Sequence, residues 1–188
     1  SAVRSLGKPA YVVIRKAQTL APELLERYRD AGRGDLFIEP EEALPVLTRR
    51  SLLIVTDTHN PRMLDSAKLY EEASTVVVID HHRKMVDHID NAVIFYHEPY
   101  SSSASEMVAE LVQYLSGCTV TRLDAEALLA GIMLDTRSFV MKAGVRTFEA
   151  AAYLRRLGAD TVEVKRLFSG SMELYKEKTD IVSHARLY

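Results

Sequence analysis

The sequence predicts an α/β fold, with a parallel, doubly wound sheet in the first half of the chain and a helical segment in the second. In the first half, short apolar runs alternate with segments of helical periodicity. The run at 74–79 is continuous and rich in β-branched residues, which is typical of a parallel strand buried on both faces. Beyond it, apolar residues recur at the spacing of helices that have one polar side.

The first half contains five expected strands, at 11–14, 36–38, 51–56, 74–79 and 92–96. Helices are expected between them, at 19–31, 41–48 and 63–73. Pro45 weakens the second of these helices. Near the start of the chain, Gly7 with Pro9 just beyond it predicts the end of a helix. The chain from Asp57 to Asp80 is long enough for one crossover helix between parallel neighbours.

The second half contains clear helix starts. Ser103 to Glu106 has the form of a capping box and predicts a helix at 107–115. Thr121 to Asp124 offers a second start, for an apolar helix at 125–134. Further helices are expected at 148–157, 161–168 and 172–184.

Composition limits the function classes. The 188 residues carry a net charge of −2, so no overall positive field attracts the chain to nucleic acid or anionic lipid. A single cysteine, Cys118, excludes an internal disulfide framework and fits a reducing compartment. No apolar run approaches the roughly 20 residues of a membrane span. We therefore expect one cytoplasmic domain with no membrane segment in this chain.

Acidic residues and histidines follow the two central strands. Asp57 ends the strand at 51–56, and Asp80, His81 and His82 follow the strand at 74–79. The carboxyl ends of neighbouring parallel strands meet at one edge of a sheet, where α/β folds bind ligands. A carboxylate and two imidazoles held there suit a transition metal. Taken alone, Asp-His-His is more simply a turn with two solvent-facing histidines.

Asp135 is a third acidic candidate, because it ends the apolar helix at 125–134. A buried carboxylate needs a partner, which a metal ion or Arg137 would supply. Asp57, His81 and Asp135 form a mixed oxygen and nitrogen set, which suits manganese or another six-coordinate divalent ion. His59 either approaches this site or is a loop histidine that makes a hydrogen bond.

Three segments resemble the second, third and fourth motifs of the DHH phosphoesterases, in matching order and spacing. They are Val-Thr-Asp-Thr-His-Asn-Pro at 55–61, Val-Ile-Asp-His-His at 78–82 and Leu-Ala-Gly-Ile-Met-Leu-Asp-Thr at 129–136. Within that family, the segment at 146–160 is most similar to the DHH domain of cyclic-di-AMP phosphodiesterases of the GdpP type. The resemblance covers essentially the whole chain.

The resemblance implies roles for these residues. Asp57 would bridge two manganese ions, and His81 and Asp135 would complete the protein ligands of one of them. Asp80 would accept a ring N–H from a histidine and orient it. His82 would donate to the substrate phosphate. Two further residues are candidates for substrate binding and have simpler alternatives: Arg137, which is equally well a surface arginine, and Ser103, which is equally well a helix cap.

The resemblance also implies missing parts. The first family motif, a histidine and two aspartates that ligate both metals, is not found, and neither is the DHH-associated domain beyond Tyr188. We therefore expect a DHH domain at 1–160 without its first motif, and a helical connector at 161–188. Such a chain would be feebly active by itself. The full-length protein would be a candidate for the cytoplasmic face of the membrane, and a homodimer is a further option.

Three functions stay open from the sequence. The first is hydrolysis of the cyclic dinucleotide cyclic-di-AMP to the linear dinucleotide. The second keeps the chemistry but acts on short oligoribonucleotides, on single-stranded DNA as RecJ-like exonucleases do, or on pyrophosphate. The mild negative charge disfavours a long nucleic acid as partner. The third is a non-catalytic nucleotide-binding regulatory module.

Overall fold

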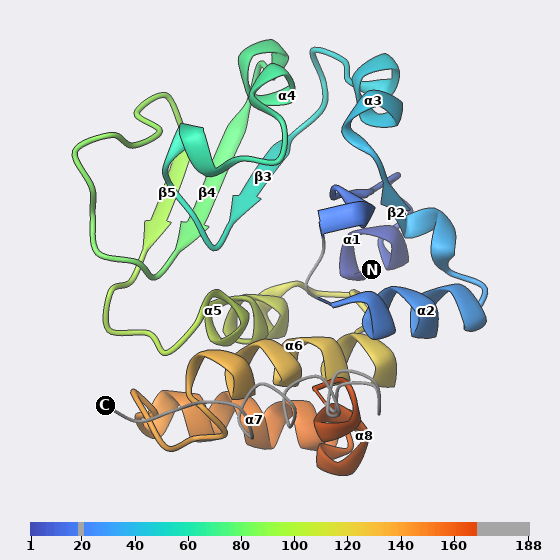
Figure 1. Ribbon diagram of the computed structural model, residues 1–188, viewed down its shortest axis with the longest axis vertical. Coiled ribbons are helices and arrows are strands. Elements are labelled where there is room, and N and C mark those ends of the chain that lie inside the picture. Colours follow the sequence, from blue (N-terminus) through green and yellow to red (C-terminus); the bar gives the residue numbers. More distant parts are fainter. Residues whose placement is uncertain (19–20, 169–188) are drawn as a thin grey trace, which may run out of the picture.

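The computed structural model describes residues 1–18 and 21–168 (Figure 1). Parallel strands alternate with helices in the first half, and helices follow, as the sequence predicts. The helix expected at 172–184 and most of the expected connector lie outside the described residues. No helix within the described ranges is both long enough and apolar enough to cross a membrane.

Each element that was expected within the described residues is present, although most are shorter than predicted. The strands are β1 (Val12–Val13), β2 (Phe37–Ile38), β3 (Leu53–Thr56), β4 (Val76–Asp80) and β5 (Ile94–His97). The helices are α1 (Ala2–Ser5), α2 (Pro22–Asp30), α3 (Pro40–Ala43), α4 (Ala67–Glu72), α5 (Ala104–Leu111), α6 (Arg122–Asp135), α7 (Val145–Arg156) and α8 (Thr161–Arg166).

The strands form two separate parallel sheets, where we expected one. β1 pairs with β2, and β4 lies between β3 and β5 in the other sheet. β1 and β2 contribute two residues each, which is too little to extend a ladder. Among the described strands, none pairs with the outer edge of β3. The register that matters for the site aligns Thr56 of β3 with Ile79 of β4, so both strands end at the same edge.

The helices of the second half form layers beside this sheet (Figure 1). α5 contacts β4, α6 and α7, and α6 also contacts α7 and α8. The core of this layer includes Leu129 and Ile132 of α6 and Leu154 of α7, each at most 1% exposed. A second core, around Val55, Val78 and other residues, lies on one face of the sheet. α6 is thus enclosed by other helices, which explains why its sequence is apolar on most sides.

The helix signals are partly those predicted. Thr121 and Asp124 form a capping box at the start of α6, where a helix start was predicted. Ser103 caps α5 by accepting a hydrogen bond from the backbone N–H of Glu106. The reciprocal bond of a capping box is not formed there, because the Glu106 carboxylate is used elsewhere. At the end of α1, Gly7 adopts a left-handed conformation with φ +70°.

A close approach between α5 and α6 depends on Gly131. A Cβ atom at this position would lie 2.1 Å from Oγ of Ser105 and 2.9 Å from its Cβ. Both residues line a small cavity of about 230 Å³, which Asp57 and Asp135 line as well. The absence of a side chain at Gly131 therefore lets α6 bring Asp135 close to the sheet.

Candidate metal centre

Asp57 lies at the end of β3 in an unusual backbone conformation. Its N–H donates to the carbonyl of Ile79 at 3.0 Å, which keeps the chain beside β4 for one residue beyond the strand. Its φ is +64°, in the left-handed region that aspartate tolerates better than most residues do. The side chain is 58% exposed, so the carboxylate stands at the open rim of the sheet.

His81 follows β4 and faces both predicted carboxylates. Its Nε2 atom lies 3.3 Å from Oδ1 of Asp57 and 3.8 Å from Oδ2 of Asp135. Its Nδ1 atom lies 3.3 Å from the carbonyl oxygen of Ser101. Because a carbonyl oxygen only accepts, Nδ1 carries the proton of that bond, and Nε2 is the nitrogen left for a ligand. The structure thus brings Asp57, His81 and Asp135 together from two strand ends and one helix end.

The electrostatics of this group favour a cation. The hydrogen bond to Asp57 raises the pKa of His81, with further contributions from the charges of Asp57 and Asp135. Burial, and then the negative charge of Asp57, raise the pKa of Asp135. A negative charge held close to a carboxyl group hinders its ionisation. A divalent ion among these residues would relieve this repulsion and compete with the protons.

Asp80 is fully buried and anchors the neighbouring histidines. Its Oδ1 atom accepts the Nδ1–H of His82 at 2.8 Å and the backbone N–H of His81 at 2.9 Å, and its Oδ2 atom accepts from His59. Burial by itself would raise the pKa of Asp80, but the hydrogen bonds from His82 and His59 outweigh it and hold the pKa below its usual value. Asp80 is therefore a charged acceptor that fixes the ring of His82.

His59 forms a hydrogen bond with Asp80, in agreement with the alternative that it is a loop histidine making a hydrogen bond. It is 1% exposed, and both of its ring nitrogens are occupied. Nδ1 contacts Asp80, and Nε2 accepts the backbone N–H of Met85 at 2.9 Å. His97, which sequence reasoning gave no role, contacts the carbonyl of His82 through its Nε2. Only burial of the His59 ring reveals this arrangement, and spacing in the sequence does not.

His82 is half-exposed and lies close to the metal candidates. Asp57, His81 and His82 each offer one ligand atom, and these atoms lie within 4.8 Å of one another. The Nδ1 atom of His82 is bonded to Asp80, so Nε2 is the nitrogen left for a metal ion or a phosphate. This geometry admits either role for His82.

The turn after α6 carries two basic residues, Arg137 and Lys142. Arg137 is exposed at φ +47°, and its side chain makes no ion pair with the residues that the structure describes. Lys142, also at a positive φ, lowers the pKa of Asp135 through its charge. Lys142 could not be predicted, because the turn contains left-handed residues of types that rarely adopt that conformation, among them Arg137, Ser138 and Phe139.

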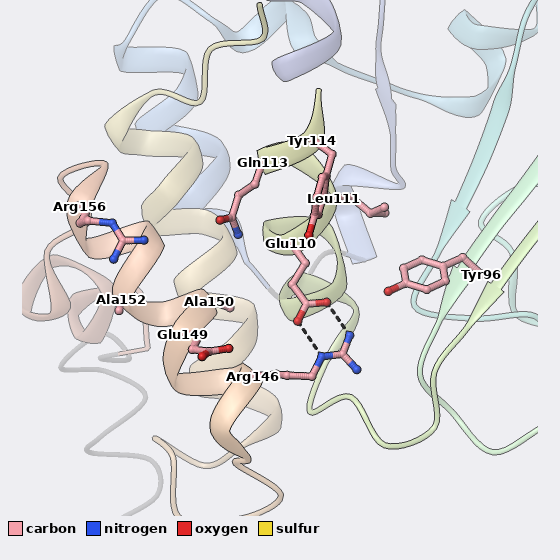
Figure 2. A pocket seen from close by; sticks show the side chains of 10 residues that line it. All are labelled: Tyr96, Glu110, Leu111, Gln113, Tyr114, Arg146, Glu149, Ala150, Ala152 and Arg156. Carbon is pink, nitrogen blue, oxygen red and sulfur yellow. Dashed lines mark hydrogen bonds and ion pairs between the residues drawn. The ribbon is translucent and has the colours of Figure 1, made fainter. Parts of the chain in front are cut away.

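Two other features do not take part in the centre. Ser103 is fully buried and its hydroxyl caps α5, so the substrate role predicted for it has no exposed surface to act through. A cavity of about 730 Å³ lies elsewhere, between β5, α5 and α7 (Figure 2). Its lining includes Tyr96, Tyr114 and the ion pair between Glu110 and Arg146, and none of the predicted site residues.

Comparisons with known proteins identify the family of this chain. A family model for "DHH family, N-terminal domain" matches residues 9–132. The chain is 41% identical over 191 residues to the cyclic-di-AMP phosphodiesterase GdpP of Geobacillus thermodenitrificans (strain NG80-2), which covers 98% of this chain and 29% of that protein. It is 36% identical over 186 residues to the cyclic-di-AMP phosphodiesterase PdeA of Listeria monocytogenes (serotype 1/2a, strain 10403S). This match covers 95% of this chain and 28% of that protein. The chain thus spans less than a third of these relatives.

Solved structures show the same fold. An exopolyphosphatase-related protein from Bacteroides fragilis superposes with a TM-score of 0.67 at 16% identity, over 99% of this chain and 64% of that one. A putative family II inorganic pyrophosphatase from Methanococcus jannaschii gives a TM-score of 0.52 at 22% identity, over 77% and 47%. At such low identity the likeness concerns the fold alone.

The family assignment rests on agreement between sequence and fold. The matched region includes β3, β4 and the residues at their carboxyl ends, and Asp135 follows shortly after it. The two phosphodiesterase relatives cover nearly the whole chain. The chain therefore belongs to the DHH family of phosphoesterases.

Proposed function

We propose that this chain carries the metal-binding half of the active site of a manganese-dependent phosphodiesterase, which hydrolyses cyclic-di-AMP to the linear dinucleotide pApA. The observation that carries this proposal is the convergence of Asp57 and Asp135 on Nε2 of His81, at 3.3 and 3.8 Å. The substrate is inferred from the relatives that are named cyclic-di-AMP phosphodiesterases and cover nearly the whole of this chain.

The donor atoms fit a divalent ion with mixed oxygen and nitrogen ligands. Carboxylates suit manganese and magnesium, and an imidazole favours manganese between these two. Asp57, which stands at the exposed rim, His81 and Asp135 are the residues that would hold divalent ions here. Burial, and after it the negative charge of Asp57, raise the pKa of Asp135, and the second of these causes supports a cation between the two carboxylates.

The chemistry divides between the ions and the protein. When bound, two divalent ions lower the pKa of a coordinated water and stabilise the entering and leaving oxygens of an in-line displacement. His82 would donate its Nε2–H to a phosphoryl oxygen. Asp80 accepts the Nδ1–H of His82 at 2.8 Å and so orients the ring, and buried His59 fixes Asp80 in turn.

The experiment is manganese-dependent hydrolysis of cyclic-di-AMP, with pApA detected by chromatography. It compares the 188-residue chain with a version extended at both ends to the length of the relatives. We expect turnover from the extended protein and at best feeble turnover from the chain alone, because three ligands suffice for one ion but not for two. Comparable rates would contradict the second expectation.

The same assay separates the other functions. Faster turnover of short oligoribonucleotides, single-stranded DNA or pyrophosphate would replace the substrate and keep the chemistry. Binding of cyclic-di-AMP by the extended protein without turnover, in the presence of manganese, would indicate a regulatory module. A weak dependence of substrate affinity on salt is expected for a small ligand, since few phosphates are contacted.

A further inference from the structure

A buried carboxylate outside the metal centre, that of Glu106 on α5, has no part in the function proposed so far. Glu106 is 1% exposed. Its Oε1 atom accepts from the hydroxyl of Ser101 at 2.8 Å, and its Oε2 atom accepts from the hydroxyl of Thr147 at 2.6 Å. Oε2 also accepts from both the backbone N–H, at 3.3 Å, and the hydroxyl of Ser102. Burial by itself would raise the pKa of Glu106, but the hydrogen bonds from Ser102, Thr147 and Ser101 outweigh it and lower the pKa.

One peptide group connects this carboxylate to the metal centre. The carbonyl of Ser101 and the N–H of Ser102 belong to the same planar, trans peptide unit, so they point in opposite directions. The N–H is held by Glu106, and the carbonyl oxygen accepts from Nδ1 of His81. Fixing one end of a planar unit fixes the direction of the other.

We propose that Glu106 is a positioning residue for His81. It orients the peptide between Ser101 and Ser102 so that the Ser101 carbonyl holds the Nδ1–H of His81 and directs Nε2 toward Asp57 and Asp135. The proposal rests on the proposed function in one respect, namely that Nε2 of His81 ligates the metal. Carbonyls and carboxylates that accept the second ring N–H of a histidine ligand are known to govern its orientation and its metal affinity.

The chain offers a matched control one helical turn away. Glu110 lies four residues after Glu106 on α5 and also reaches α7, where it forms two contacts with Arg146, at 2.8 and 2.6 Å (Figure 2). Both glutamates therefore link the same two helices. Of the two, only Glu106 contacts Ser101 and Ser102. A purely structural role in joining α5 to α7 therefore predicts similar consequences for both glutamates.

The first readout is the Nδ1–H proton of His81, observed by nitrogen-edited NMR. It is measured in the metal-free chain at a pH below the His81 pKa, where both ring nitrogens are protonated. We expect a slowly exchanging Nδ1–H signal in the wild type and in Glu110→Ala, and its loss to solvent exchange in Glu106→Ala. Glu106→Gln keeps an oxygen that can accept the Ser102 N–H, so it should retain the signal in part. Absence of the signal from the wild type, or its persistence in folded Glu106→Ala, would overturn the proposal.

The second readout is manganese affinity by calorimetry. Glu106→Ala should weaken binding about 10–100-fold, the usual cost of losing a group that orients a metal ligand. Glu106→Gln should recover most of the affinity, and Glu110→Ala should match the wild type. An equal loss in Glu110→Ala would assign the effect to helix packing and refute the positioning role.

Two outcomes need separate treatment. If Glu106→Ala does not fold, Ser102→Ala replaces it, because this variant removes one of the two contacts between Ser102 and Glu106. Ser102→Ala should accelerate exchange of the same His81 proton. An unchanged exchange rate would overturn the proposal. If the extended protein binds no manganese, the proposed function fails, while the NMR readout still decides whether Glu106 positions His81.

Discussion

Nε2 of His81 lies 3.3 Å from Oδ1 of Asp57, across the carboxyl ends of two neighbouring parallel strands. The pairing of Thr56 with Ile79 produces this contact, since each strand then ends within one residue of the other. Asp135 reaches the same imidazole from the end of α6, at 3.8 Å. The candidate centre is thus assembled from three separate elements, each of which can be tested by substitution.

Asp57 combines a charge with a left-handed backbone, and two substitutions separate the two properties. Asp57→Asn removes the charge but keeps a side chain that tolerates φ +64°. Asp57→Ala removes the charge and adds backbone strain of about 1–2 kcal/mol. We expect both variants to lose manganese binding in a titration, and only the alanine variant to lose stability in urea unfolding. Anomalous scattering at the manganese edge provides the direct check, and peaks distant from Asp57, His81 and Asp135 would contradict the assignment.

His81 and His82 should fail in different ways. His81→Ala removes a proposed ligand, so metal occupancy should fall. His82→Ala should leave the metal bound but reduce turnover of the extended protein by about 10²–10³-fold, as expected for loss of a charge-stabilising donor. Metal analysis alongside kinetics distinguishes the two. Equal metal loss in both variants would instead make His82 a ligand, which its position within 4.8 Å of the other candidates allows.

Gly131→Ala should destabilise the fold. The added Cβ would lie 2.1 Å from Oγ of Ser105, and overpacking of this kind costs about 1–3 kcal/mol. The gain in helix propensity, about 1 kcal/mol, offsets part of this cost. Ser105→Ala in the same chain should restore part of the lost stability, because it removes the closest atom. A urea-unfolding midpoint of Gly131→Ala equal to or above that of the wild type would show that α5 and α6 can separate without penalty.

Acid should remove a specific contribution to stability at Asp124. This residue is 7% exposed and accepts from the hydroxyl of Tyr28 at 2.7 Å. Burial opposes its ionisation, but hydrogen bonds from Ser1, Thr121 and Tyr28 hold its pKa below 3.8 in the folded state. A lowered folded-state pKa means that the contribution is fully present above the ordinary value and is lost as the pH falls below 3.8 toward the folded-state pKa.

Tyr28→Phe measures that contribution. At neutral pH it should cost about 1.5–3 kcal/mol, the usual range for a hydrogen bond to a charged group. The cost should shrink as Asp124 becomes protonated. Urea unfolding from neutral pH to below 3.8 follows the difference, with the exposed Tyr11→Phe as the control. A cost that does not depend on pH would assign the effect to packing.

Much of the fold and of the candidate site could be predicted, because strand ends carry local signals. β-branched runs located β3 and β4, and the residues that follow a parallel strand lie at a known edge of the sheet. Asp135 was predicted because a carboxylate at the end of an apolar helix needs a partner. These inferences use short stretches of sequence and simple geometry.

The remaining features depend on contacts that sequence spacing does not encode. The bond between His59 and Asp80 forms only because both side chains are buried on the same side of the sheet edge. Lys142 approaches Asp135 through a turn of left-handed residues that are not glycine. Glu106 was interpreted as half of a capping box, whereas Thr147, far along the chain, provides one of its actual partners. The strands divide into two sheets because β1 and β2 are short, and periodicity alone overestimates the length of these strands.

The strand order also sets the mechanical character of the site. His81 follows β4, which is held by neighbours on both sides, whereas Asp57 follows β3, which has one partner strand among the described residues. Outer strands open first in local unfolding, so the two halves of the centre differ in how firmly they are anchored. A metal ion bound by residues of both strands would stabilise the attachment of β3 to β4. Metal binding and the integrity of this sheet are then two measures of a single equilibrium.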